Sequence, residues 1–440
     1  MSINSFFKTE SSSTKDDLNT VKWRESGRTW VGTFRRPAPA DRFAAFDLDK
    51  TLVNVKGPWK YPRGPDDWVF FHASVPKVLQ RMHREGYKIV IISNQYGLKP
   101  AKGSTGLTQM ARDYRLKIQK IAAHLDVPFT ILAATEKDYM RKPSPGMWLL
   151  AEMDNGGVEV DRSASFFVGD AAGRPDNWRP GAVADFSDSD LAFALNAGVP
   201  FYTPEQMFNN KALADEALSL TLPNASAWSL GRFKPKVLDT DREAHASLLA
   251  AIKTDAEAAR EQGKGLLVLL VGQPASGKST FATKHLEPLG FERINMDTLK
   301  TSKKCHDAVK SGLASGKLLV VDNTNPCVDS RGAYVQLAKG AGARAIAVVF
   351  DHETRELAAH NNVYRAQVAQ ARYLAKDGSA AKDLWSVPVV DSSVPAVAYN
   401  MFFKKFSAPD VSEGFERILR HAFVPTFESA LDELLWSQYY

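Results

Sequence analysis

An apolar run near residue 45 ends in two carboxylates. Phe43-Ala-Ala-Phe is followed at once by Asp47-Leu-Asp49-Lys-Thr51. Such a run predicts a short buried β-strand, and side chains two positions apart at its end point the same way. Asp47 and Asp49 should therefore meet at the carboxyl edge of a sheet, where their repulsion calls for a divalent cation such as Mg²⁺ with oxygen ligands. The stretch predicts a phosphoryl-handling site; the alternative is a solvated turn with a helix cap after the strand.

Further apolar runs alternate with helical patterns along the chain. After residue 47 they cover 87–92, 127–132, 165–168 and 265–271, and the clearest helical stretches are 75–85 and 241–262. This alternation predicts mostly parallel sheets covered by helices, with sites at the carboxyl ends of the strands. We expect an α/β fold with two doubly wound domains. The predicted parts are a disordered tail at 1–20, a first domain at 21–221, a linker and connecting helix at 222–262, and a second domain at 263–440.

Composition excludes several classes of protein. The 440 residues are 44% hydrophobic and carry a net charge of +6, which suits a polyanionic partner without proving one. The two cysteines, Cys305 and Cys327, have neither CxxC nor paired His spacing, so neither a disulfide framework nor a zinc site is predicted. No apolar run approaches the roughly 20 residues that cross a bilayer, and no signal peptide is apparent. We expect a soluble monomer in a reducing compartment.

Three further groups extend the first site. Ser93 and Asn94 follow the run at 87–92, so a hydroxyl and exposed backbone amides lie where a phosphate oxygen could be held. Lys142 comes before Ser144-Pro145, which reads as a helix cap followed by proline in the first turn. Asp170 ends the run that begins at residue 165. The pattern predicts a hydroxyl, a cation and a third carboxylate at strand ends and helix starts.

A second phosphate site is predicted from a glycine-rich loop. Directly after the strand at 265–271 stand Gly272, Gln273, Pro274, Ala275, Ser276, Gly277, Lys278, Ser279 and Thr280. They fit the GxxxxGK[ST] pattern, in which backbone amides hold the nucleotide phosphates, the lysine reaches the β- and γ-oxygens, and the hydroxyl of Ser279 binds Mg²⁺. We expect ATP as the ligand; a glycine-rich turn is the alternative.

Carboxylates and arginines beyond this loop are candidates for kinase chemistry. Asp297 could accept the proton of an attacking hydroxyl, although an ordinary helix cap is the alternative. Asp322 ends a buried run at 318–321 and is placed to orient the hydrated metal. Arg331 and Arg365 are candidates for stabilising transition-state charge, and Arg372 lies on the same side of its helix as Arg365. A surface arginine is the alternative for each.

The order of DxDxT, Ser, Lys and Gly-Asp resembles the haloacid dehalogenase superfamily of phosphatases. That resemblance implies that Asp47 attacks phosphorus, and that Asp49 protonates the leaving oxygen and then activates water. Ser93 and Lys142 would hold the phosphoryl oxygens. Asp170, with Asp47 and a main-chain carbonyl near Asp49, would hold Mg²⁺. This chain departs from the usual motif at one position, because Lys50 stands where glycine is common.

Both motif sets together resemble the bifunctional polynucleotide kinase 3′-phosphatases of animal-type DNA end repair. Segments that carry the resemblance include 46–49, 93–95, 141–148, 167–175, 185–187, 193–196, 272–280, 322–326 and 360–362. The family implies removal of a 3′-phosphate by the first domain and transfer of the ATP γ-phosphate to a 5′-hydroxyl by the second. Asp297 would be the base. DNA ends are then the expected partners. The nucleus is the expected location, and the mitochondrion is a second one.

Departures from that family lie in the arginine pattern and at the N-terminus. In Ser330-Arg331-Gly-Ala333-Tyr334 a second arginine is missing. The residues before Trp23 leave no room for a forkhead-associated domain, and Ile3, Phe6 and Phe7 resemble the hydrophobic part of a sliding-clamp peptide, or form an incidental apolar patch. Two rival functions stay open: healing of RNA ends, and a fused phosphatase and kinase for small metabolites. A scaffold with one dead site has no support, because every catalytic position is filled.

Overall fold

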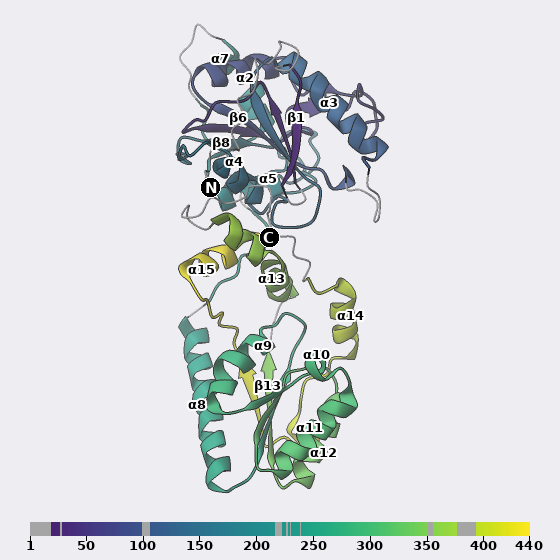
Figure 1. Ribbon diagram of the computed structural model, residues 1–440, viewed down its shortest axis with the longest axis vertical. Coiled ribbons are helices and arrows are strands. Elements are labelled where there is room, and N and C mark those ends of the chain that lie inside the picture. The colour runs from purple at the N-terminus through teal and green to yellow at the C-terminus, as the bar shows by residue number, and fades with distance from the viewer. Residues whose placement is uncertain are drawn as a thin grey trace, which may run out of the picture. The chain divides into compact units, whose positions relative to one another are not determined.

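The chain forms two compact units, each with its own sheet (Figure 1). The structure is a computed structural model and describes residues 19–26, 29–98, 106–215, 222–225, 228, 230–237, 239–350, 355–375 and 393–440. Unit 1 contains Met1–Arg232, Gln367–Val390 and Gln438–Tyr440, and unit 2 contains Phe233–Ala366 and Asp391–Ser437. The tail residues Ile3, Phe6 and Phe7 lie outside the described residues, so the clamp peptide stays a prediction.

Unit 1 is built on a seven-stranded sheet in the described part of the chain. In spatial order its strands are β1 (Lys22–Ser26), β2 (Thr29–Phe34), β7 (Phe129–Ala134), β6 (Lys88–Asn94), β3 (Phe43–Phe46), β8 (Phe166–Val168) and β9 (Phe201–Tyr202). β2 pairs antiparallel with β1 and β7, and the other pairs are parallel. A separate antiparallel pair, β4 (Val53–Asn54) and β5 (Val69–Phe70), follows β3.

Helices cover both faces of this sheet, as the alternating pattern predicts. They are α2 (Val75–Arg84), α3 (Gln109–Leu125), α4 (Gly146–Met153), α5 (Ser189–Ala197), α6 (Pro204–Phe208) and α7 (Lys211–Ala214). α2, α3 and α6 pack with Phe46 and its neighbours in one core. On the opposite face the Phe43 ring lies 5.6 Å from that of Trp148 in α4, and the Phe167 ring 4.8 Å from that of Phe193 in α5. Strand residues alternate between the two layers because their side chains alternate in direction.

Unit 2 is built on a fully parallel sheet. The order is β11 (Glu292–Ile294), β12 (Leu318–Val321), β10 (Leu266–Val271), β13 (Arg344–Phe350) and β14 (Arg417–His421). Its helices include α8 (Asp239–Glu261), α9 (Lys278–Phe281), α10 (Met296–Leu299), α11 (Ser302–Ala314), α12 (Val328–Gly340), α14 (Ala396–Lys405) and α15 (Ala430–Trp436). Leu266, Val268 and Leu270 pack against α8 and α9, whereas Leu267 and Leu269 pack against α11 and α12. Each unit is therefore doubly wound, which confirms the predicted fold class.

The units of the structure differ from the predicted domains at two segments of the chain. α8 starts two residues before the predicted helix, and it belongs to the core of unit 2 through Leu248, Ile252 and Ala256, so it is more than a connection. The predicted second domain runs to residue 440, whereas among the described residues 367–375 and 438–440 belong to unit 1, and α13 (Arg355–Ala375) contributes to both units. The apolar pattern of α13 could not reveal this, because it does not show which core covers each turn.

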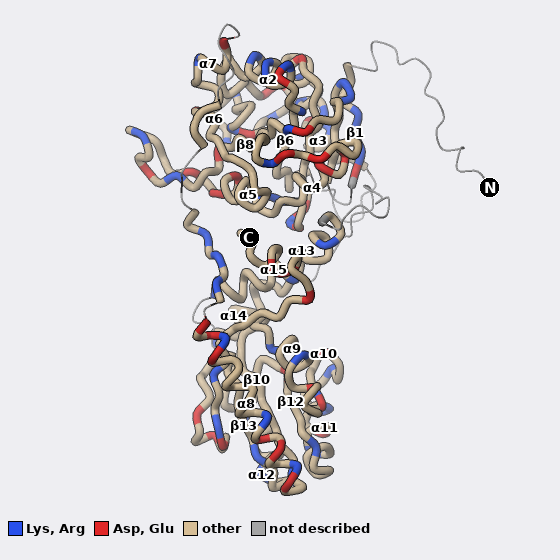
Figure 2. The backbone as a smooth tube through the Cα atoms, turned by 90° about the vertical axis from the view of Figure 1, so that its left-hand side faces the viewer, with Lys and Arg blue, Asp and Glu red and all other residues tan. Residues whose placement is uncertain are grey.

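Charge is spread along both units. Figure 2 shows basic and acidic residues interspersed over the described parts of each unit. Among the helices that the structure describes, we find none long and apolar enough to cross a membrane.

Candidate active sites

The end of β3 presents Asp47 at the carboxyl edge of the sheet. The amide of Asp47 donates to the carbonyl of Val168 at 2.8 Å, which ties this end to β8. The chain then turns, and the Lys50 amide donates to the Val53 carbonyl at 2.7 Å. Lys50 has φ of +63°, in the left-handed region that glycine adopts with less strain. The turn therefore keeps a conformation suited to glycine although the residue is lysine.

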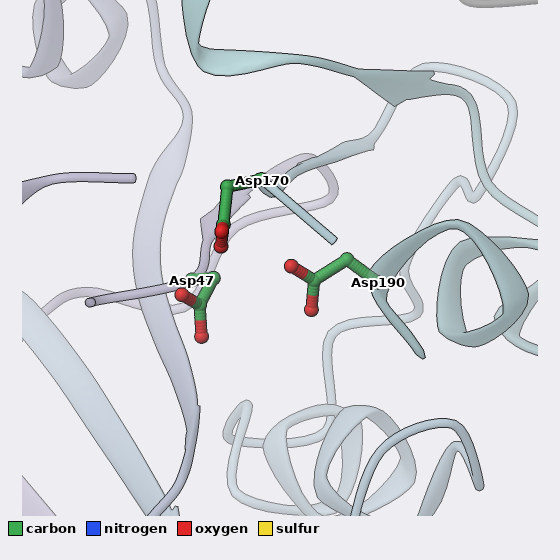
Figure 3. A group of neighbouring side chains, drawn as sticks. All are labelled: Asp47, Asp170 and Asp190. Carbon is green, nitrogen blue, oxygen red and sulfur yellow. The ribbon is translucent and has the colours of Figure 1, made fainter. Parts of the chain in front are cut away.

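Three carboxylates meet above this edge. Asp47 and Asp170 come from the ends of neighbouring strands, as predicted, and Asp190 comes from the first turn of α5. One oxygen from each lies within 4.8 Å of the others, and Figure 3 shows the three groups pointing toward one another. Sequence reasoning missed Asp190, because an acid in a first helical turn is also the ordinary complement of the helix dipole. Three convergent carboxylates are a donor set that fits Mg²⁺.

The Lys142 ammonium neutralises part of this charge. Its Nζ lies 2.5 Å from Asp47 Oδ1 and 2.7 Å from Asp190 Oδ1, and it donates to the Ile92 carbonyl at 3.0 Å. Burial alone would lower the pKa of Lys142, but the carboxylates of Asp190 and Asp47 outweigh it and raise the pKa. Lys142 is therefore a fixed cation at the base of the site.

Excess negative charge persists despite Lys142. Burial, with the carboxylates of Asp190 and Asp170, raises the pKa of Asp47 well above its usual range, against the opposing charge of Lys142. Burial and Asp190 likewise raise the pKa of Asp170 to about 7, although Lys142 and Lys50 oppose the shift. Burial is the larger cause of both shifts and the neighbouring carboxylates add to it, and a divalent cation would offset this repulsion.

The other predicted residues of this site lie on β6 and beside it. Ser93 is buried, and its Oγ accepts from Gln95 Nε2 at 2.8 Å. The Asn94 side chain is occupied, because its Oδ1 accepts from the Lys142 amide at 3.0 Å and its Nδ2 donates to the Lys142 carbonyl at 3.1 Å. Ser144 is not the cap predicted from sequence: α4 begins at Gly146, with Pro145 in the cap position.

Asp49 lies apart from the carboxylate group. Its side chain is half exposed, Oδ1 lies 2.9 Å from the ammonium of Lys117, and Oδ2 accepts from Gln95 Nε2 at 2.7 Å. Its carboxylate is not one of the three that converge among the described residues. Asp49 is therefore separate from the carboxylate group of Asp47, Asp170 and Asp190.

The glycine-rich loop in unit 2 wraps around Lys278. Ala275 and Gly277 have φ of +59° and +91°, which turn the loop back toward α9. Lys278 Nζ donates to the carbonyls of Gly272 at 2.9 Å and Gln273 at 2.7 Å, and to Ser276 Oγ at 3.1 Å. Burial lowers the pKa of Lys278 to about 8, although the Asp322 carboxylate opposes the shift. The lysine is thus held inside its loop, where nucleotide phosphates would replace the carbonyls as partners.

Asp297 and Asp322 lie beyond the ends of β11 and β12. Asp297 is exposed on α10, and the cap of that helix is Asn295, whose Oδ1 accepts from the Thr298 amide at 2.8 Å. Asp297 is therefore not the helix cap that was its alternative role. Asp322 Oδ2 accepts from Arg293 Nε at 2.8 Å and NH2 at 2.5 Å, a contact that the sequence did not suggest.

The guanidinium of Arg331, a predicted transition-state arginine, is bound by partners within unit 2. It is fully buried, and its Nε and NH2 donate to the Glu413 carboxylate at 2.8 Å and 2.6 Å. Its NH1 donates to the carbonyls of Asn325 and Ser407. All three guanidinium nitrogens are engaged within the protein, and NH1 holds the 322–326 segment through the Asn325 carbonyl, so a role of Arg331 in stabilising transition-state charge stays a prediction. Arg365 is exposed on α13, and its charge acts on Tyr399, so the structure leaves its predicted role open.

Comparisons with known proteins find relatives of both units. Residues 42–208 match the family model described as polynucleotide kinase 3 phosphatase, and residues 267–377 match an AAA domain model. The chain is 32% identical over 401 residues to the "Bifunctional polynucleotide phosphatase/kinase" of Schizosaccharomyces pombe, covering 90% of this chain and 84% of that protein.

Two further relatives cover different shares of the chain. The "Putative bifunctional polynucleotide phosphatase/kinase" of Acanthamoeba polyphaga mimivirus is 30% identical, covering 90% of this chain and 88% of the viral protein. The "Polynucleotide 3'-phosphatase" of Saccharomyces cerevisiae is 27% identical and covers 38% of this chain and 86% of its own length. Since the similarity to the first two runs through both units, the chain belongs to the family of bifunctional polynucleotide phosphatase/kinases.

Proposed function

We propose that unit 1 removes 3′-phosphates from DNA ends through an aspartyl-phosphate on Asp47. The supporting observation is the cluster of Asp47, Asp170, Asp190 and Lys142, in which one carboxylate oxygen is held 2.5 Å from a buried ammonium. Asp47 attacks phosphorus, and the bond to the 3′-oxygen breaks while the carboxyl of Asp49 gives that oxygen a proton. Asp49 then takes a proton from water, whose oxygen attacks phosphorus and frees Asp47 and inorganic phosphate.

Mg²⁺ is the proposed cofactor of this site. Asp47, Asp170 and Asp190 would hold it, with a main-chain carbonyl near Asp49, and the raised pKa values of Asp47 and Asp170 support this assignment. When bound, the ion would offset the charge of the phosphoryl group and the carboxylates. Lys142 and the Ser93 hydroxyl would hold the phosphoryl oxygens from the protein side.

Unit 2 is proposed to transfer the γ-phosphate of ATP to a 5′-hydroxyl. The loop 272–280 would hold the phosphates, and the Ser279 hydroxyl and Asp322 would position Mg²⁺. Asp297 would accept the hydroxyl proton as the 5′-oxygen attacks phosphorus and the bond to the ADP oxygen breaks. The exposure of Asp297 supports this role, because a base for a polymer end must be reachable.

A polymer substrate is favoured by exposed aromatic and basic groups on unit 1. Tyr61 and Phe186 are 70% and 86% exposed, and Lys60 Nζ lies 5.5 Å and 5.3 Å from their ring centres. Phe186 lies near the end of the segment that follows Asp170. The residue after it, Ser187, accepts a hydrogen bond at its carbonyl from the Gly173 amide at 3.1 Å. Exposed rings beside a lysine suit stacked bases and a phosphate backbone rather than a small metabolite.

The test uses an oligonucleotide with a 3′-phosphate and a 5′-hydroxyl, incubated with Mg²⁺ and labelled ATP. We expect loss of the 3′-phosphate and gain of the 5′ label. Asp47→Ala should abolish only the first reaction and Lys278→Ala only the second. Faster turnover of sugar phosphates or free nucleosides would refute the proposal, and faster turnover of a matched RNA end would move the substrate from DNA to RNA. A DNA substrate also favours a location in the nucleus or mitochondrion.

A further inference from the structure

Lys117 occupies an unusual position for a lysine. It lies on the buried stripe of α3, between Tyr114 and Ile121, where an amphipathic helix normally places apolar side chains. Only 6% of its side chain is exposed. An ammonium group is costly to bury unless an anion compensates for the lost water. The carboxylate that contacts Lys117 Nζ is that of Asp49, at 2.9 Å.

The two carboxylate oxygens of Asp49 have different partners. Lys117 holds Oδ1, and Oδ2 accepts from Gln95 Nε2, which also donates to Ser93 Oγ. Gln95 can therefore lose its hydrogen bond to Oδ2 and keep the one to Ser93 Oγ. Lys117 is buried, and its ammonium contacts Oδ1. Since the Asp49 side chain is half exposed, Oδ2 is the oxygen that an incoming substrate can reach.

We propose that Lys117 is a positioning residue for proton transfer by Asp49 in the phosphatase reaction. This inference rests on the proposed function, in which Asp49 protonates the departing 3′-oxygen. Lys117 keeps Oδ1 in place and stabilises the carboxylate that remains once Oδ2 has given its proton to that oxygen. Lys117 itself transfers no proton in this scheme, and the Asp49 carboxylate regains one from the water that attacks phosphorus.

The test compares two leaving groups in the full-length protein. A 3′-phosphorylated oligonucleotide has an alkoxide leaving group that needs a proton, whereas dinitrophenyl phosphate releases a phenolate that does not. We expect Lys117→Met to lower kcat/KM, which reports the attack of Asp47 before the hydrolysis step that both substrates share, by about 10- to 100-fold for the oligonucleotide and by less than about threefold for dinitrophenyl phosphate. Lys117→Gln, which keeps a donor but not the charge, should show the same selectivity more weakly.

Lys120→Met is the matched control. Lys120 is one turn further along α3 and also contacts a carboxylate, Asp66 Oδ1 at 2.5 Å, but both side chains are exposed. It should leave both substrates unaffected. Equal losses for both substrates in Lys117→Met and Lys117→Gln, or no loss, would overturn the inference.

Asp49→Asn separates this failure from that of the proposed function. If Asp49→Asn is selective for the oligonucleotide and the Lys117 variants are not, the role of Lys117 alone is wrong. If Asp49→Asn also lacks selectivity, the assignment of Asp49 as the acid fails first.

Discussion

Asp190 contacts both the buried ammonium of Lys142 and the carboxylate group of unit 1. It contacts Lys142 Nζ at 2.7 Å and lies with Asp47 and Asp170 in the carboxylate group. We expect Asp190→Asn to raise the Mg²⁺ concentration needed for half-maximal phosphatase activity by about 10- to 100-fold, because one ligand loses its charge and Lys142 turns wholly to Asp47. Titrating activity against Mg²⁺ checks this.

The control for Asp190 lies two residues earlier. Asp188→Asn removes a carboxylate that contacts Arg232 instead of Lys142, and it should leave the Mg²⁺ requirement unchanged. If Asp190→Asn and Asp188→Asn shift the requirement equally, Asp190 has no special place at the metal.

Strand-end residues could be predicted from sequence, and their partners on helices could not. Asp47 and Asp170 follow apolar runs, and parallel strands bring such ends to one edge. Asp190 and Lys117 are far from Asp47 and Asp49 in sequence, and no motif ties either of them to these two residues. The burial of Arg331 could not be predicted for a related reason, because a charged residue gives no sign of its own burial and Glu413, its partner, is 82 residues away.

At the scale of elements, the segment 360–362 fastens helix α13 to its neighbours in unit 2. His360 Nε2 lies 2.7 Å from the Trp436 carbonyl of α15, and Trp436 Nε1 donates to Asn361 Oδ1 at 2.8 Å. Asn362 exchanges two hydrogen bonds with the backbone of Val394. These contacts give His360, Asn361 and Asn362 a structural role. The sequence alone could not distinguish this role from a catalytic one.

Burial of His360 makes this packing sensitive to acid. Burial lowers the pKa of His360 to about 4. Below the ordinary histidine pKa near 6.5, the unfolded state binds a proton to His360 more readily than the folded state does. The stabilising contribution of buried His360 is therefore present above that pH and is lost as pH falls toward 4. The loss in unfolding free energy should be roughly 1 to 3 kcal/mol.

Urea unfolding at several pH values measures this. His360→Gln keeps a donor for the Trp436 carbonyl but does not titrate, so it should lose less stability than the parent protein between pH 6.5 and 4. Parallel curves for the two proteins would show that His360 does not carry the acid sensitivity.

At the scale of the whole molecule, unit 1 is completed by residues from the far end of the chain. Tyr139 Oη donates to Gln438 Oε1 at 3.1 Å, and the Tyr139 amide donates to Gln370 Oε1 at 2.9 Å, all in buried surroundings. Asn196 exchanges two hydrogen bonds with the backbone of Tyr439, and it also donates to the Pro143 carbonyl, next to Lys142. Through Asn196, residue Tyr439 therefore supports the loop that carries Lys142.

Deleting residues 438–440 should weaken the phosphatase and spare the kinase. The deletion leaves the Tyr139 hydroxyl buried without its acceptor, which costs about 1 to 3 kcal/mol, and it frees Asn196 beside the Lys142 loop. We expect phosphatase activity to be lost at a lower temperature on graded heating while kinase activity in the same samples follows the parent curve. Removing Tyr440 alone, whose carbonyl accepts a hydrogen bond from the partly exposed Arg232, is the control and should change little. An equal loss of both activities would mean that these residues stabilise the protein as a whole, and an unchanged phosphatase would mean that unit 1 is complete without them.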